Sequence, residues 1–186
     1  MENRYIVSVN TNHIVKVSQP TSKTLVYRIP YNQLKSYTID NRFIVYILVE
    51  ERVQEKDLIY VGKSKNSINT RPTSHNDKSK NWTYCYVLTT IPNDTFLNDG
   101  VCQYLENKIC EKINDSNKFE NTTCQTNIDT VNNFEEIFCE KFLNEIFEML
   151  EILNLTLKKN NETEIVEENE EKKMRKKKQK RLNHTP

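Results

Sequence analysis

Glycine is scarce in this chain, which contains only Gly62 and Gly100 among its 186 residues. Glycine allows the backbone to turn tightly or to approach another group closely. In a chain with so few glycines, each glycine is a candidate for a position that requires one of these two properties. Gly62 closes the triplet Tyr60-Val61-Gly62, at the end of an apolar, strand-like run. We therefore predict a local structural or ligand-binding role for Gly62.

Other absences exclude several classes of protein. No apolar run reaches the roughly 18 residues that a membrane-spanning helix needs, and the opening residues lead into alternating apolar sequence instead of a secretory signal. No zinc-finger spacing, helix-turn-helix pattern or ribonucleoprotein aromatic motif is present. We expect a cytoplasmic protein that does not bind membranes, and its target sequence and oligomeric state remain open.

Cysteine is present but has no paired motif. The five cysteines are an odd number and include no C-x-x-C pair, and several fall at apolar positions of expected helices and strands. This usage favours reduced thiols in the core over metal ligands.

The net charge of +1 hides a strong asymmetry near the C-terminus. A glutamate-rich block at 162–171 precedes the basic run from Lys172 to Arg181, and outside these blocks the charges nearly balance. Any affinity for nucleic acid must therefore come from a local patch or from this tail. The basic run is a candidate nucleic-acid-binding arm, a nuclear import signal in a eukaryotic host, or a solvated tail paired with the acidic block.

Apolar periodicity predicts the main elements. Short strands are expected within residues 5–29, followed by strands at 43–49, 58–61 and 82–89. Apolar residues that recur every four positions from Leu97 to Ile113 predict an amphipathic helix. A second, phenylalanine-rich helix is expected at about 133–153, with one apolar side formed by Phe134, Ile137, Phe138, Phe142, Leu143, Ile146, Phe147 and Leu150.

Five separated side chains carry groups that phosphodiester cleavage requires. Tyr46 and Tyr60 are phenols on the two expected strands, Arg71 and His75 follow them, and Glu106 lies beside the buried stripe of the first helix. A guanidinium neutralises phosphate charge, an imidazole or a phenol handles a proton, and a carboxylate binds one hard cation. Together these groups indicate a nuclease.

Residues 43–106 resemble the GIY-YIG endonuclease family. The resemblance is carried by Val45-Tyr46, by Tyr60-Val61-Gly62, by the R-x-x-x-H spacing of Arg71 and His75, and by Glu106. It implies an α/β fold with a small three-stranded sheet flanked by helices, here preceded by a short β lead-in and followed by a C-terminal support helix. The corresponding segments are 1–40 for the lead-in and linker, 41–117 for the nuclease domain, 118–157 for a helical accessory segment, and 158–186 for a charged tail expected to be disordered.

The resemblance also implies roles for the residues of the site. Arg71 would bind the scissile phosphate, and Glu106 would hold a single Mg²⁺ or Mn²⁺ ion. Tyr46 or Tyr60 would position or deprotonate the attacking water, with His75 accepting the proton or orienting a tyrosine. A phenol has an ordinary pKa of about 10, so its neighbours must lower that pKa before it acts as a base. Further substrate contacts are expected from Gly62, Lys63, Lys65 and Asn121, with Asn117 as the alternative to Asn121.

Two departures from the family pattern affect this hypothesis. Ile44 stands where the first triplet begins with glycine, and Pro72 disfavours helical geometry at Arg71. The expected function is metal-dependent hydrolysis of DNA, with RNA as another possible substrate. Two alternatives are a non-catalytic nucleic-acid-binding module on the same scaffold and a protein-interaction adaptor built on the phenylalanine-rich helix.

Overall fold

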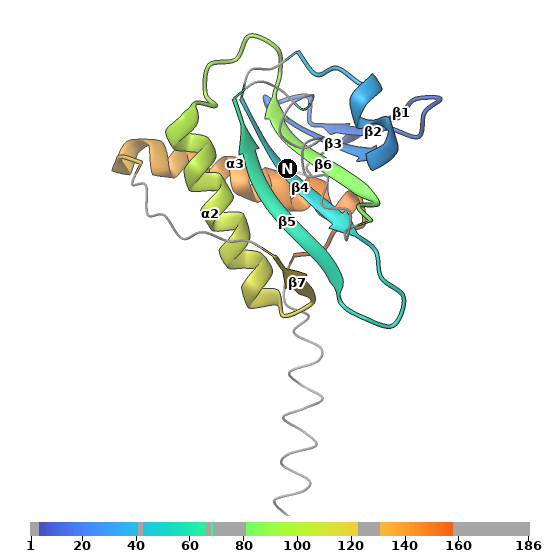
Figure 1. Cartoon of the computed structure of the whole chain (residues 1–186). Helices are drawn as coiled ribbons and strands as arrows, with labels where there is room; N and C mark the ends of the chain where they lie inside the picture. Colours follow the sequence, from blue (N-terminus) through green and yellow to red (C-terminus); the bar gives the residue numbers. More distant parts are fainter. Residues whose placement is uncertain (1–3, 41–42, 66–67, 69–80, 123–130, 158–186) are drawn as a thin grey trace, which may run out of the picture.

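The computed structural model describes residues 4–40, 43–65, 68, 81–122 and 131–157, without the side chains of Asn133 and Phe134. The chain folds into one sheet with helices on both faces (Figure 1). Its elements are β1 (Ile6–Val9), β2 (Val15–Ser18), β3 (Thr24–Pro30), the 3₁₀ helix η1 (Tyr31–Ser36), β4 (Ile44–Glu50), β5 (Asp57–Ser64), β6 (Tyr84–Thr90), α2 (Asp99–Ser116), β7 (Phe119–Asn121) and α3 (Asn133–Ile152).

The sheet has seven strands in the order β1-β2-β3-β6-β4-β5-β7, so the prediction of a small three-stranded sheet is wrong. The expected lead-in strands join this same sheet, because β3 pairs with β6 from Thr24 opposite Thr90 to Pro30 opposite Tyr84. At the other end, β7 adds parallel to β5. Strand edges pair through backbone groups that every residue carries, so apolar patterning locates strands but does not show which edges meet.

β4 is the central strand of the predicted motif, and its residues Ile44 to Val49 are all buried. It pairs antiparallel with β5 on one side and with β6 on the other. A strand covered on both faces needs apolar side chains throughout, which explains its continuous apolar sequence.

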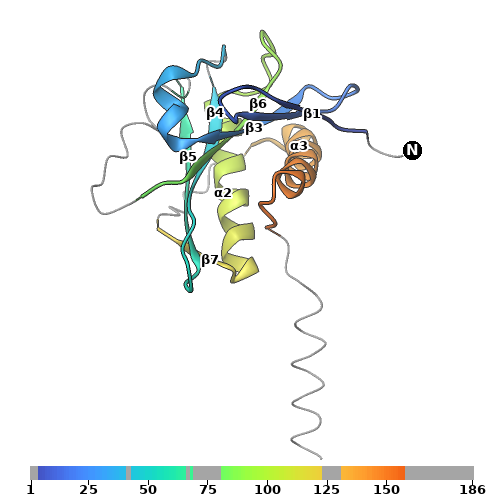
Figure 2. The ribbon, with the colours of Figure 1, turned by 90° about the vertical axis from the view of Figure 1, so that its right-hand side faces the viewer.

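Each face of the sheet has its own core. α2 and α3 cover one side, which we call the helix face, and its core includes Val45, Ile47, Ile59 and Val61 (Figure 2). The opposite side, the η1 face, is covered by η1 and by loops that contribute buried residues such as Leu34, Ile39, Ile68 and Trp82. Alternation along β4 and β5 therefore sends neighbouring side chains of the motif to opposite faces.

The predicted helix stripe is confirmed in α2, where Val101, Leu105, Ile109 and Ile113 are buried. The helix begins after Asn98, whose side chain accepts a hydrogen bond from the amide of Val101 at 2.9 Å, which satisfies an otherwise unpaired donor of the first turn. It ends at Asn117, which caps the helix in a left-handed conformation with φ 52°.

The second predicted helix is confirmed as α3, but its apolar side is narrower than expected. Phe142, Leu143, Ile146 and Leu150 are buried, whereas Ile137 and Phe138 are 68% and 48% exposed. The N-terminal part of α3 therefore presents apolar residues to solvent. No helix in the described part of the chain is long and apolar enough to cross a membrane.

The prediction that all five cysteines are reduced is wrong for Cys110, which is disulfide-bonded. Cys85, Cys102 and Cys139 are free and buried, as predicted. Cys124 lies outside the described residues. Single-chain patterning could not separate Cys110 from the others, because a buried thiol and a buried half-cystine occupy the same apolar helix positions.

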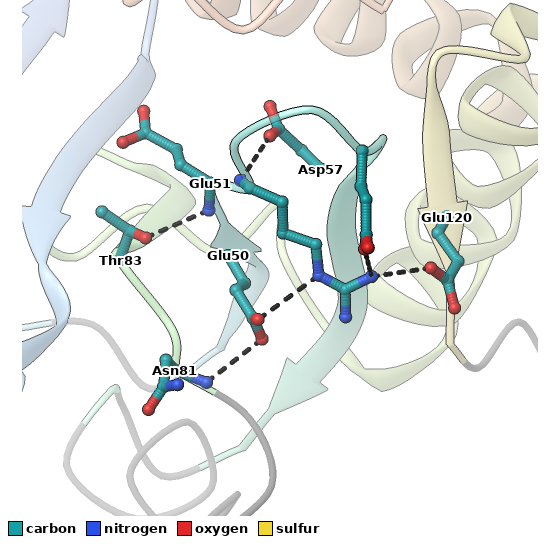
Figure 3. Close-up of polar contacts among 8 residues, drawn as sticks. Glu50, Glu51, Asp57, Asn81, Thr83 and Glu120 are labelled. Carbon is teal, nitrogen blue, oxygen red and sulfur yellow. Dashed lines mark hydrogen bonds and ion pairs between the residues drawn. The ribbon is translucent and has the colours of Figure 1, made fainter.

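Arg52 joins the strands at the end of the sheet that carries the β4–β5 loop, and Figure 3 labels its partners Glu50, Asp57 and Glu120. Its guanidinium contacts Glu50 of β4 at 3.3 Å and Glu120 of β7 at 2.7 Å, and its backbone amide donates to Asp57 at 2.9 Å. Glu50 in turn accepts from the amide of Asn81 at 3.1 Å. This network links β4, β5 and β7 and the segment that leads into β6.

Candidate functional site

The two motif tyrosines and Gly62 form one cluster on the η1 face. Tyr46 lies directly opposite Gly62 in the β4–β5 register, and Tyr60 is two positions earlier on β5. The two rings have centroids 6.1 Å apart and are tilted by 31°. The structure therefore brings together both phenols and the glycine that the sequence singled out.

Gly62 makes this cluster possible because the phenol end of Tyr46 lies over its α-carbon. A Cβ atom at position 62 would lie 2.6 Å from both Cζ and the hydroxyl oxygen of Tyr46, and 2.9 Å from Cε1 of Tyr60. Any larger residue would have to displace a ring. The predicted special role of Gly62 is thus close packing by two tyrosine side chains.

The two tyrosines differ in their access to solvent. Tyr46 is fully buried, whereas Tyr60 is only partly buried. A group that contacts substrate directly must be reachable, so Tyr60 is the better placed of the two phenols. Tyr46 is placed to orient Tyr60 through ring contact.

Tyr60 lies just beyond the part of β5 that pairs with β7. β7 pairs with β5 only at Asp57, Leu58 and Ile59, and Thr122 then donates its amide to the Ile59 carbonyl at 3.1 Å. Beyond Ile59, no strand within the described residues pairs with that edge of β5.

Lys63 points to the opposite face from Tyr60 and contacts the start of α2. Its Nζ donates to Asp99 Oδ1 at 2.9 Å, and Lys65 Nζ lies 2.8 Å from Asp99 Oδ2. Hydrogen bonds from Lys63 and then Lys65 lower the pKa of Asp99, which stays ionised. One carboxylate therefore pairs with both of the predicted phosphate-binding lysines and offsets one of their two charges.

Glu106 lies on α2, on the flank of the helix that also carries Cys102 and Asp99. Its carboxylate accepts from Gln103 Nε2 at 3.3 Å, and its side chain is partly exposed. Burial raises the pKa of the Cys102 thiol to about 12; the positive charge of Lys63 opposes this shift, and the negative charges of Asp99 and Glu106 add to it. Lys63 and Glu106 therefore share one electrostatic neighbourhood.

The other flank of α2 faces α3, where the Tyr104 hydroxyl donates to Glu136 at 3.2 Å and to Glu140 at 2.9 Å. Glu106 is turned away from this contact, because residues two apart on a helix lie on nearly opposite sides of it. The structure thus places Tyr60 on the η1 face and Glu106 on a helix that covers the opposite face of the sheet.

Asn121 lies on β7, and its side-chain amide is hydrogen-bonded to α2. It lies opposite Ile59 in the β5–β7 register, and its Nδ2 donates to Asn114 Oδ1 at 3.0 Å. Asn117, the alternative candidate, caps α2, and its Oδ1 accepts from Lys56 Nζ at 2.7 Å. Of the two, Asn121 is the closer in register to Tyr60.

Arg71 and His75 lie outside the described residues. Asp99 is the described residue of this neighbourhood that sequence reasoning missed. In the sequence, Asp99 is marked only by its position directly after Asn98, in the first turn of the predicted helix. Acidic residues are common in the first turn because they interact favourably with the helix dipole, so the sequence gives no sign that Asp99 binds lysines.

A multidentate metal site is not formed by the described residues, which contain no group of three or more histidine, cysteine, aspartate or glutamate side chains suited to one ion. Glu106 is a single, partly exposed carboxylate, which suits a hard cation that keeps most of its water. No protein-family model, curated protein or solved structure matches this chain. The functional argument therefore depends on the residues themselves.

Proposed function

We propose that this protein is a GIY-YIG-type, metal-dependent endonuclease that hydrolyses phosphodiester bonds of DNA. The observation that carries the proposal is the cluster of Tyr46, Tyr60 and Gly62 on the η1 face, with Lys63 next along β5. Phenol and ammonium groups match the chemistry of a backbone phosphate, and Glu106 of α2 would add the carboxylate.

The described side chains support distinct roles. Tyr60 would orient the attacking water, and the buried ring of Tyr46, which contacts it, would keep Tyr60 in position. Lys63 can bind the phosphate as a point charge once the phosphate competes for it with Asp99. Arg71 and His75 are proposed to complete the site, on the strength of the sequence motif alone.

Glu106 would hold one Mg²⁺ or Mn²⁺ ion. A cation bound there neutralises phosphate charge and lowers the pKa of a bound water. A single protein carboxylate gives weak affinity in the absence of substrate, because the remaining ligands come from water and the phosphate. Metal binding should therefore strengthen when nucleic acid is present.

A second candidate is a nucleic-acid-binding module without catalysis. The pairing of Lys63 and Lys65 with Asp99 and the complete burial of Tyr46 favour it, because both features suit a scaffold better than a reactive centre. In that case Tyr60 and Lys63 would contact the nucleic-acid backbone without cutting it.

Plasmid nicking in Mg²⁺ or Mn²⁺ separates these two functions when it is measured beside binding. We expect Glu106→Gln to reduce nicking by about a hundredfold or more while DNA binding changes little, as for loss of one transition-state interaction. Glu111→Gln is the matched control, since Glu111 lies on the same helix in an exposed pair with Lys108. Equal nicking by both variants would exclude Glu106 from the reaction, and binding without nicking by the native chain would select the second candidate.

A further inference from the structure

A cavity of about 340 Å³ lies where β3 begins and β6 ends, on the face of the sheet that α3 covers. Its lining includes Thr24 and Thr90, which lie opposite each other in the sheet and are 1% and 3% exposed. The turn before β3 and the middle of α3 complete the lining. Cavities that bind small molecules typically measure roughly 300–1,000 Å³, so this one is large enough for a compact ligand.

Three phenylalanines supply the apolar part of this lining. Phe96 and Phe142 pack against each other with ring centroids 5.3 Å apart and a tilt of 57°. Phe138, one turn before Phe142 on α3, also lines the cavity and is 48% exposed. Aromatic rings pack well against another ring, and their faces attract cations. The cavity therefore uses the part of α3 whose apolar residues are not buried against the sheet.

The carboxylate of Glu145 is held in a fixed orientation in the same lining. The hydroxyls of Ser22 and Thr24 both donate to its Oε2 atom. Within the described part of the chain, Oε1 has no hydrogen-bond partner and no cationic side chain pairs with Glu145. Neutral hydroxyls orient a carboxylate without cancelling its charge, so Glu145 keeps the capacity to bind a cation through Oε1.

The other charged groups of the lining do not compensate Glu145. Asp94, whose side chain is 6% exposed, pairs with Lys23 at 2.7 Å and accepts from the Phe96 amide at 2.9 Å. Burial raises the pKa of Asp94, but the hydrogen bonds from Lys23 and Phe96 lower this pKa by more, so Asp94 is ionised and its charge is cancelled by Lys23. Lys141 is exposed, one turn before Glu145, and forms no ion pair with it.

We propose that this cavity binds a small molecule that carries a protonated amine on an aromatic body. The ammonium group donates to Oε1 of Glu145, and the ring packs among the three phenylalanines. A ligand that carries only a carboxylate gains no partner at Glu145 and is repelled by it. None of the lining residues belongs to the proposed nuclease site, so this binding is independent of the proposed nuclease activity.

Two sources share this ligand chemistry, a free aromatic amine and an aromatic α-amino acid. The amino acid differs in its carboxylate, which Lys141 at the mouth of the cavity can bind. Tighter binding of the amino acid, lost in Lys141→Gln, would identify it as the source. Tighter binding of the free amine would exclude the amino acid.

Titration followed by protein NMR tests the ligand class with three probes that share a phenyl ring: phenethylamine, L-phenylalanine and 3-phenylpropionate. We expect the two amines to bind with dissociation constants of about millimolar or below, which is typical of ligands of this size, and phenylpropionate to bind at least about tenfold more weakly. The amide signals of the turn before β3 and of Phe96 should shift on binding. Absence of binding by both amines at about 10 mM, or equal binding by phenylpropionate, would overturn the proposal.

Substitutions test whether the amine binds in this cavity. Glu145→Gln should weaken the binding of phenethylamine about tenfold or more, as for loss of a charge-assisted hydrogen bond. Glu148→Gln is the matched control, because Glu148 lies on the same helix and accepts from the Tyr5 hydroxyl but lines a different groove.

Phe138→Ala gives a second test at a side chain that is half exposed, so the fold should be retained. It should also weaken phenethylamine binding, because one wall of the cavity is removed. Thermal unfolding shows which variants are folded, and Phe138→Ala decides alone if Glu145→Gln is not. Unchanged affinity in the folded variants would place the amine elsewhere and reject this cavity.

Discussion

Asp99 joins the end of β5 to the start of α2 by binding two lysines with its two carboxylate oxygens. Lys63 approaches Oδ1 at 2.9 Å and Lys65 approaches Oδ2 at 2.8 Å, with side chains 19% and 58% exposed. This pairing offsets one of the two positive charges of Lys63 and Lys65. Its consequences can be tested without knowing the biological target.

Replacing Asp99 by asparagine should strengthen binding to nucleic acid. The change removes one negative charge and releases two lysines, so affinity for a DNA duplex should rise severalfold at low salt and fall more steeply as salt is added. Fluorescence anisotropy at several salt concentrations measures both effects. Asp115→Asn, at the exposed other end of α2, is the control with the same change in charge. Equal gains in both variants would mean that overall charge, and not the release of these lysines, sets the affinity.

The same carboxylate predicts a small dependence of stability on pH. The lysines lower the pKa of Asp99 in the folded state, so its stabilising effect is present above the pKa of the unfolded state, about 3.9, and is lost as pH falls through the folded-state pKa. Because the pair is partly exposed, the effect should stay below about 1 kcal/mol. Thermal unfolding of the native chain and of Asp99→Asn should therefore differ at pH 7 and converge under acidic conditions. A difference that persists unchanged in acid would contradict this account.

Gly62→Ala should destabilise the protein by forcing a methyl group against buried aromatic atoms. The added Cβ would lie 2.6 Å from Tyr46. The Tyr46 side chain is fully buried, so its ring cannot move aside without displacing other core residues. Overpacking of this kind typically costs about 1–3 kcal/mol. Gly100→Ala is the control, because its nearest contact would be an ordinary 3.5 Å to Asn98 and it lies in the first turn of a helix. Urea unfolding of both variants compares them directly.

A second substitution shows whether the Tyr46 ring is the cause of that loss. Tyr46→Leu removes the ring atoms nearest to position 62, so Gly62→Ala should cost less in the Tyr46→Leu chain than in the native chain. The difference between the two costs is the coupling free energy of the pair. An unchanged cost would mean that the Tyr46 ring is not the cause, and would leave the Tyr60 ring, 2.9 Å from the added Cβ, as the contact that requires glycine.

Arg52→Gln should loosen β7 from the sheet. The guanidinium joins Glu50 to Glu120, and glutamine can replace neither the charge nor the two-sided contact (Figure 3). Hydrogen exchange should therefore accelerate at Phe119 to Asn121 while the amides of β4 keep their protection. Lys118→Gln, a neutralising change beside β7, should have little effect. Faster exchange throughout the sheet would instead indicate global destabilisation.

Several elements could be predicted because they depend on local patterns. The stripe from Leu97 to Ile113 predicted α2, and the apolar runs around Tyr46 and Tyr60 predicted β4 and β5. The single glycine of the motif predicted a close approach, which the structure shows to come from a tyrosine ring. These features are encoded by side chains that are near one another in sequence.

Other features could not be predicted, because they depend on contacts between distant residues. The sequence showed a phenol at 46, but only packing on the η1 face made it fully buried. It showed lysines at 63 and 65, but only the docking of α2 brought Asp99 to them.

By itself, the sequence of this protein determined where its two long helices and most of its strands lie, although not η1 or β7, and which chemical groups occur between residues 46 and 106. Only the tertiary structure decided that the sheet has seven strands, that Tyr60 and the helix that carries Glu106 lie on opposite faces of it, and that β1 is left exposed. The physical reason is that helix and strand formation follows side-chain periodicity over a few residues. The pairing of strand edges uses backbone groups common to all residues, and is settled by the packing of the whole chain.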